Sequence, residues 1–185
     1  MTKVSEKEIL KTPVFTVVEK EIKEAPFKPV GLNCAHWVMV VALDSRSDKT
    51  IIVQQSRWGV EKKTIEFPCG TVEGTGPNEE IHQCAAAREF KEETGIPITA
   101  LDLKDIGEFN PNPAYFNNKM HVYVYKSKDL EKDYENRLEP ELDSTEDCVV
   151  DIISLKKLLN DESFLSNGMT LSALTLLARK GFIKF

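Results

Sequence analysis

The chain has 185 residues, a length that suits one main domain with an appended element. Its hydrophobic share of 41% is that of a globular protein and excludes disordered and collagen-like chains. There are 24 Lys and Arg against 30 Asp and Glu, and the resulting net charge of −6 argues against nucleic acid as a partner. The longest apolar run, Trp37 to Leu43, is far shorter than the ~20 residues of a membrane-spanning helix.

The sequence predicts a cytoplasmic protein without a membrane segment. Residues 1–11 mix Lys and Glu and lack the apolar stretch of a secretory signal. The cysteines are widely scattered and form no Cys-x-x-Cys pair, so we expect reduced thiols and neither a zinc site nor a redox site. They are Cys34, Cys69, Cys84 and Cys148.

The first predicted strand, Val14–Ile22, is rich in β-branched residues. It lies in an N-terminal β extension, residues 1–33, which precedes a main domain of residues 34–185. Two further strands, His36–Ala42 and Thr50–Gln55, are predicted to form a hairpin because a polar, turn-forming stretch separates them.

Helical and extended patterns alternate in the rest of the chain. Pro77–Thr94 is predicted to be a helix, since proline suits the first helical position and Gly95 is placed to terminate it. The other predicted strands are Thr64–Phe67, Leu101–Gly107, Met120–Lys126 and Val149–Ile153, and the other helices are Leu155–Leu159 and Leu171–Arg179.

Three glutamates of the long predicted helix, Glu89, Glu92 and Glu93, share one face, because at ~100° per residue they fall within an arc of roughly 100°. Like charges so close repel one another unless they are fully solvated or neutralised by a cation. Such an oxygen-rich cluster suits Mg²⁺ or Mn²⁺. Arg88 lies one turn before Glu92, where it can orient or partly neutralise that carboxylate. Taken alone, the run is better explained as a solvated helix face; the surrounding pattern favours a metal site.

That pattern resembles the Nudix hydrolase signature, G-x5-E-x7-R-E-U-x-E-E-x-G-U, in which U is a bulky apolar residue. Its fixed positions are filled by Gly74, Glu80, Arg88, Glu89, Phe90, Glu92, Glu93, Gly95 and Ile96. Upstream, Glu66 to Glu73 is similar to the E-x-P-x-G-x-x-E run of the family, whose glycine normally opens the signature. The first glycine is therefore either Gly74, or Gly70 with four extra residues before Arg88.

The resemblance implies an α/β/α sandwich around a mixed β-sheet, here with the N-terminal antiparallel β extension added. It also implies a pyrophosphohydrolase that uses Mg²⁺ or Mn²⁺. The family's metal ligands match Glu89, Glu92, Glu93 and the backbone carbonyl of Cys69. Arg88 and Glu92 are the matching residues for a part in catalysis, and Glu80 is a supporting residue.

The general base in this family often comes from an acidic loop before the last strand of the sheet. In this chain the matching segment is residues 141–147. Its placement just before the predicted strand makes Glu146 the first candidate for the base, with Asp143 and Glu141 behind it.

The substrate class is indicated by a similarity to the ADP-ribose pyrophosphatase branch. Gln55-Ser56-Arg57, followed by the run from Glu66 to Gly70, is similar to the Q-x-R and E-L-P-A-G pattern of that branch. The similarity implies that Arg57 contacts the substrate phosphates, with Glu66 and Tyr115 as further substrate-binding candidates. The loop before Tyr115 departs from the branch, since it has Asn-Pro-Ala instead of Ser-Pro-Gly. Other nucleoside diphosphate sugars and dinucleotides therefore stay open.

The predicted reaction is cleavage of ADP-ribose or another nucleoside diphosphate sugar to a nucleoside monophosphate and a sugar phosphate. The alternatives are hydrolysis of nucleoside triphosphates, dinucleotides or capped RNA, and a Nudix-fold protein that binds a nucleotide sugar without turnover. Because the N-terminal β region often packs across a dimer in this branch, a homodimer is expected. His36, His82 and His121 have no motif spacing and are interpreted as structural.

Overall fold

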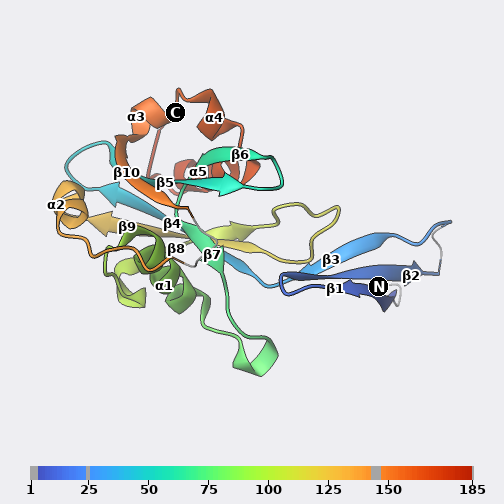
Figure 1. Cartoon of the computed structure of the whole chain (residues 1–185). Helices are drawn as coiled ribbons and strands as arrows, with labels where there is room; N and C mark the ends of the chain where they lie inside the picture. The colour runs from blue at the N-terminus through green and yellow to red at the C-terminus, as the bar shows by residue number, and fades with distance from the viewer. Residues whose placement is uncertain (1–3, 24–25, 143–146, 185) are drawn as a thin grey trace.

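The structure is a computed structural model, and it describes residues 4–23, 26–142 and 147–184. Within these residues a seven-stranded mixed sheet carries helices on both faces, and a three-stranded antiparallel sheet projects from this body (Figure 1). The predicted α/β/α sandwich with an N-terminal antiparallel β extension is therefore confirmed.

The N-terminal sheet has the order β1-β2-β3, and each neighbouring pair is antiparallel. Its strands are β1 (Val4–Lys11), β2 (Phe15–Ile22) and β3 (Val30–Cys34). Only β2 was predicted, because β1 is dominated by charged and polar residues and gives no apolar stripe.

The main sheet has the order β10-β5-β4-β9-β8, with β6 paired to β5 and β7 paired to β4. Only β4 and β9 run parallel among these pairs of described strands. The strands are β4 (Trp37–Asp44), β5 (Lys49–Arg57), β6 (Lys62–Glu66), β7 (Cys69–Thr71), β8 (Leu103–Phe109), β9 (Met120–Ser127) and β10 (Val149–Ser154).

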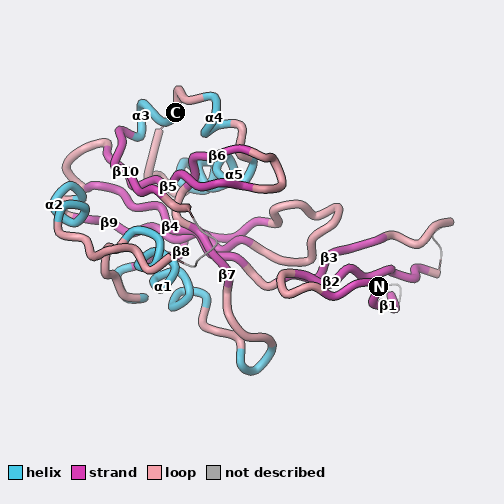
Figure 2. Tube along the Cα trace, viewed as in Figure 1, coloured by secondary structure: helices cyan, strands magenta, loops and turns pink. Residues whose placement is uncertain are grey.

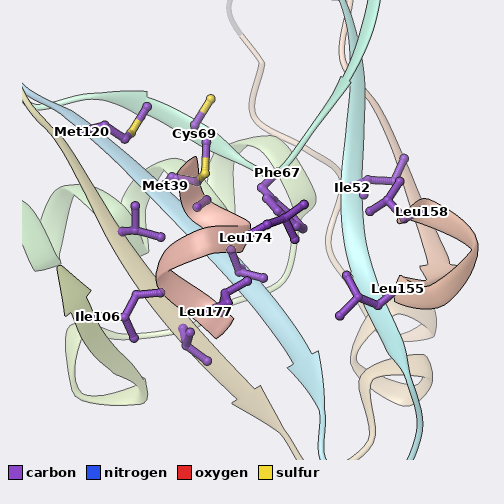
Figure 3. Packing of buried hydrophobic residues seen from close by; sticks show 14 of the residues in the cluster. Met39, Ile52, Phe67, Cys69, Ile106, Met120, Leu155, Leu158, Leu174 and Leu177 are labelled. Carbon is purple, nitrogen blue, oxygen red and sulfur yellow. The ribbon is translucent and has the colours of Figure 1, made fainter. Parts of the chain in front are cut away.

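The central strand β4 is buried on both faces, which explains its unbroken apolar run. Val38 and Val40 pack in the cluster that includes helix α1 (His82–Thr94), whereas Met39 and Val41 pack in the cluster that includes α5 (Gly168–Arg179). Figure 3 shows the second cluster, where Met39 lies near Leu174 and Leu177. The sheet therefore separates two cores, one under each helical layer.

The predicted strands on either side of the turn at residues 44–49 are confirmed, but the predicted hairpin is wrong beyond that turn. The register between β4 and β5 consists of one Cα pair, Leu43 with Thr50. Away from the turn, β4 pairs instead with β7 at Trp37–Met39, and β5 pairs with β6 at Val53–Arg57. The two strands diverge because other partners take their backbone hydrogen bonds.

The predicted helix over Pro77–Thr94 begins too early. Residues Gly76–Asn78 form one 3₁₀ turn, and α1 begins only at His82 after an extended stretch. The backbone amide of Glu80 donates to the carbonyl of Glu73 instead of continuing a helix. The end is as predicted, since Gly95 caps α1 with a left-handed φ of 71°.

Figure 2 shows the helices on both sides of the strands. The remaining ones are α2 (Leu130–Glu135), α3 (Leu155–Leu158) and α4 (Glu162–Leu165). The predicted helices near the end of the chain are confirmed as α3 and α5, whereas α2 and α4 were not predicted. Among the described residues no helix is long and apolar enough to cross a membrane.

Candidate active site

Helix α1 holds its acidic face toward a cavity and its apolar face toward the sheet. Phe90 and Ala86 are fully buried in the core. On the other face Glu89, Glu92 and Glu93 line a cavity of about 400 Å³, so the structure brings together the three carboxylates expected on one face. The same cavity is lined by Gln55, Arg57, Cys69, Gly70, Thr71, Glu73, Arg88 and Glu141.

Arg88 holds several of these carboxylates at once. Its Nη1 donates to Glu89 Oε1 at 3.0 Å and to Glu92 Oε2 at 2.9 Å. Its Nη2 donates to Glu80 Oε2 at 2.9 Å and to the carbonyl of Thr71 at 3.0 Å. A planar guanidinium can make these bonds simultaneously, whereas an ammonium group cannot match their geometry. Arg88 thus neutralises and orients the acidic face, and Glu80 supports Arg88 from outside the cavity.

The pKa of Glu89 is raised above its ordinary value, chiefly because burial penalises its charged form. The positive charge of Arg88 and the hydrogen bond from the Thr71 amide oppose this rise, while the neighbouring charge of Glu92 adds to it. A bound cation would relieve the same cost. The site is therefore electrostatically suited to a divalent metal.

The loop that enters β7 is fastened to α1 by two backbone amides. The Cys69 amide donates to Glu93 Oε2 at 2.9 Å, and the Thr71 amide donates to Glu89 Oε1 at 2.9 Å. Between them, Gly70 lies so close to Glu89 that an added Cβ would be 2.0 Å from its carboxyl carbon. The loop carbonyls and the helix carboxylates are consequently held in one place.

The two candidate first glycines have different positions. Gly70 lines the cavity, whereas Gly74 lies in the turn before α1 with a φ of 75°. A Cβ on Gly74 would be 2.1 Å from the carbonyl oxygen of Asn78. Gly70 is therefore the glycine next to the carboxylates, and the longer segment between it and α1 contains the 3₁₀ turn.

Arg57 lines the same cavity and is held by a buried carboxylate. Its Nε and Nη2 donate to Glu66 Oε1 and Oε2 at 3.0 and 2.6 Å, and Thr64 donates to the same carboxylate at 2.6 Å. Burial favours the neutral form of Glu66, but the hydrogen bonds and charge of Arg57 outweigh it and lower the pKa of Glu66. Glu66 is 2% exposed and does not line the cavity. It therefore positions Arg57, and its expected direct contact with the substrate stays a prediction.

Tyr115 does not line the cavity described above. Its carbonyl accepts a hydrogen bond from the Leu32 amide at 2.7 Å, and its side chain is 60% exposed beside the N-terminal sheet. The next residue, Phe116, packs against Trp37 with ring centroids 5.9 Å apart. Within one chain, the loop of Tyr115 joins the N-terminal sheet to the main domain.

The acidic segment predicted to carry the base is only partly described. Glu146 and Asp143 lie outside the described residues. Glu141 lines the cavity, pairs with Lys91 at 2.8 Å, and donates its backbone amide to the carbonyl of Glu92. On the other side Asp147 accepts hydrogen bonds from the amide and hydroxyl of Ser56 at 2.7 and 2.8 Å.

Three cavity residues were not predicted to belong to the site, namely Gln55, Thr71 and Glu73. Gln55 could have been predicted from its spacing to Arg57, because residues i and i+2 of a strand share one face. Gln55 therefore projects toward the same side as Arg57. Thr71 acts through its backbone amide, which no sequence pattern reveals.

The chain is similar to known proteins in sequence and in fold. The NUDIX domain profile matches residues 35–167. A methanol dehydrogenase activator from Bacillus methanolicus is 31% identical over 90 residues, which make up 48% of this chain and 44% of that protein. The crystal structure of an ADP compounds hydrolase has a TM-score of 0.68 and 21% identity, and the match covers 98% of this chain and 97% of that one. This second similarity is one of fold.

Proposed function

The chain belongs to the Nudix family, and from that premise we propose that it is a Mg²⁺- or Mn²⁺-dependent pyrophosphohydrolase. The proposed substrates are ADP-ribose and other nucleoside diphosphate sugars, and the products are a nucleoside monophosphate and a sugar phosphate. One observation carries the proposal: the carboxylates of Glu89, Glu92 and Glu93 and the cationic side chain of Arg57 line one cavity of about 400 Å³.

The donor set at this cavity fits a hard divalent cation. Carboxylate and backbone carbonyl oxygens are the ligands that Mg²⁺ prefers, and Glu89, Glu92, Glu93 and the Cys69 carbonyl would supply them. No three acidic, His or Cys side chains of the described residues already surround a cation position, and Arg88 donates hydrogen bonds to Glu89 and Glu92. Binding would therefore require these carboxylates to turn from Arg88. When bound, the ion neutralises phosphate oxygens and makes a coordinated water more nucleophilic.

The other roles follow from charge and position. Glu66 fixes the orientation of Arg57. The guanidinium N–H groups that do not bond Glu66 can bind a phosphate. Arg88 neutralises the acidic residues of α1 and holds Glu89 and Glu92 near the cavity until a cation takes over their charge. Glu146 is proposed as the general base. It precedes Asp147, which accepts hydrogen bonds from the amide and hydroxyl of Ser56, the residue before Arg57.

ADP-ribose is favoured among the substrates by two similarities. One is the Q-x-R and E-x-P-x-G pattern around Arg57 and Gly70, and the other is the fold shared with a protein described as an ADP compounds hydrolase. Nucleoside triphosphates, dinucleotides and capped RNA remain in the substrate panel. If the protein binds a nucleotide sugar without cleaving it, the enzymatic proposal is wrong and the protein is a binding module.

The test is to incubate the purified chain with Mg²⁺ and a panel of these substrates, and to separate the products by anion exchange. We expect a nucleoside monophosphate from a nucleoside diphosphate sugar, with loss of turnover in Glu93→Gln and after chelation of the metal. The matched control is Glu135→Gln, an exposed glutamate of α2. If no compound of the panel is cleaved while a nucleotide sugar binds, the protein is a binding module.

We also propose that the chain forms a homodimer through residues 1–33, the N-terminal extension. Large apolar side chains are at least half exposed there, at Ile9, Leu10, Val14, Phe27 and Val30. A small three-stranded sheet with this much uncovered apolar surface is stabilised when a second surface covers it. The boundary near residue 33 is part of this proposal, since β3 ends at Cys34.

A further inference from the structure

Gln55 is a buried polar residue in the candidate active site, and the contacts already described leave its amide nitrogen unused. Its side chain is 6% exposed and lines the same cavity as Arg57 and Glu93. Its Nε2 atom is buried and has no hydrogen-bond partner among the described residues. A buried donor without an acceptor is costly, so native proteins rarely retain one without a use for it.

The position of Gln55 on β5 shows where that donor lies. Gln55 and Arg57 are two residues apart on one strand, so their side chains share a face and stand roughly 6.6 Å apart along it. This spacing places the amide beside the phosphate-binding guanidinium. Gln54, the neighbour on the opposite face, does not line the cavity.

We propose that Gln55 is a substrate-binding residue, whose Nε2 donates a hydrogen bond to a non-bridging oxygen of the substrate diphosphate. This inference rests on the proposed function and adds a second donor to that of Arg57. The cavity is otherwise lined mainly by carboxylates, which repel a phosphate in the absence of a cation. Two donors at this spacing favour a ligand with two adjacent phosphates over a monophosphate.

Three variants test the proposal: Gln55→Leu, Gln55→Glu and the matched control Gln54→Leu. Loss of a single charge-assisted hydrogen bond to substrate is expected to raise KM by about tenfold in Gln55→Leu, with a smaller change in kcat. Gln55→Glu keeps the acceptor but removes the donor and adds a negative charge, so its KM is expected to rise further. Gln54→Leu should have the KM of the wild type.

Thermal unfolding separates a binding role from a structural one. If the donor has no partner in the free protein, Gln55→Leu removes an unsatisfied polar group, and its melting temperature should equal or exceed that of the wild type. Inorganic pyrophosphate with Mg²⁺ should stabilise the wild type and Gln54→Leu, and should stabilise Gln55→Leu much less. A lowered melting temperature with an unchanged KM, or a normal KM in Gln55→Glu, would overturn the proposal.

The pyrophosphate measurement does not depend on turnover. If no nucleoside diphosphate sugar is cleaved but the pyrophosphate effect is lost in Gln55→Leu, the proposed reaction fails and the role of Gln55 stands. If the sugar is cleaved equally well by the wild type and by Gln55→Leu, the proposed reaction stands and the role of Gln55 fails.

Discussion

Gly70 lies against the carboxylate of Glu89, so closely that an added Cβ would be 2.0 Å from the carboxyl carbon and 2.1 Å from Oε2. A methyl group at this position must displace Glu89 or the β7 loop. The absence of a side chain at residue 70 is thus a condition for the geometry of the acidic face.

We predict that Gly70→Ala lowers kcat by at least about a hundredfold, the size of effect seen when a preorganised group in an active site is lost. The readout is the initial rate at saturating substrate and Mg²⁺. Gly59→Ala is the control, because a Cβ on Gly59 meets no atom within 4 Å. Full activity in Gly70→Ala would show that Glu89 is not needed where the structure places it.

A second prediction concerns Arg88, whose side chain is 26% exposed and whose guanidinium is bonded to Glu80, Glu89 and Glu92. In Arg88→Ala the carboxylates lose their counter-charge, and we expect the free energy of unfolding to fall by about 2–4 kcal/mol. Millimolar Mg²⁺ should restore part of this loss, because the cation replaces the guanidinium charge. Urea titrations with and without Mg²⁺ measure both effects, with exposed Arg179→Ala as the control. A Mg²⁺-independent loss would contradict a cation site on α1.

The third prediction is a dependence of stability on pH that arises from Glu66. Its pKa in the folded protein lies below the ordinary value of 4.5 because Arg57 binds the charged form. The stabilisation is therefore fully present above about pH 4.5 and is lost as the pH falls through the folded-state pKa. Glu66→Gln should be less stable at neutral pH by about 2 kcal/mol. Solvent screening reduces this figure, since the Arg57 side chain is 39% exposed.

Urea unfolding of wild type and Glu66→Gln at about pH 7 and about pH 4 provides the measurement. We expect the difference between the two proteins to shrink on acidification, because protonation removes from the wild type the charge that the variant lacks. A difference that grows as the pH falls would show that the sign of the assigned pKa shift is wrong.

The fourth prediction tests the N-terminal sheet as a dimer interface. The double substitution Ile9→Glu and Leu10→Glu puts charge on strand β1, where both side chains are more than half exposed. Sedimentation should find a dimer for the wild type and a monomer for this variant. Leu101→Glu, a side chain 95% exposed in the main domain, should remain dimeric. A monomeric wild type would contradict the dimer proposal.

The local sequence was enough to predict the acidic face of α1. Helical periodicity puts Glu89, Glu92 and Glu93 on one side and Phe90 on the other, and Gly95 provides the left-handed cap that ends the helix. Most strands were predicted for the same reason, since short apolar runs bounded by turn residues are visible without tertiary contacts. The start of α1 was not predicted correctly. Glu80, which binds Arg88, lies in an extended segment, although the local sequence there would continue the helical pattern.

Relations between segments far apart in the chain were decided only by the tertiary structure. β4 lies between β5 and β9, and a sequence does not show which strand edges meet. The choice of Gly70 over Gly74 depends on an approach to Glu89 across 19 positions of the chain. Charge, apolar surface and turn geometry can be read from the local sequence, because they are properties of single residues and their near neighbours. The fold decided which of them share a cavity, because burial and close packing act between segments whose separation along the chain carries no information about their distance in space.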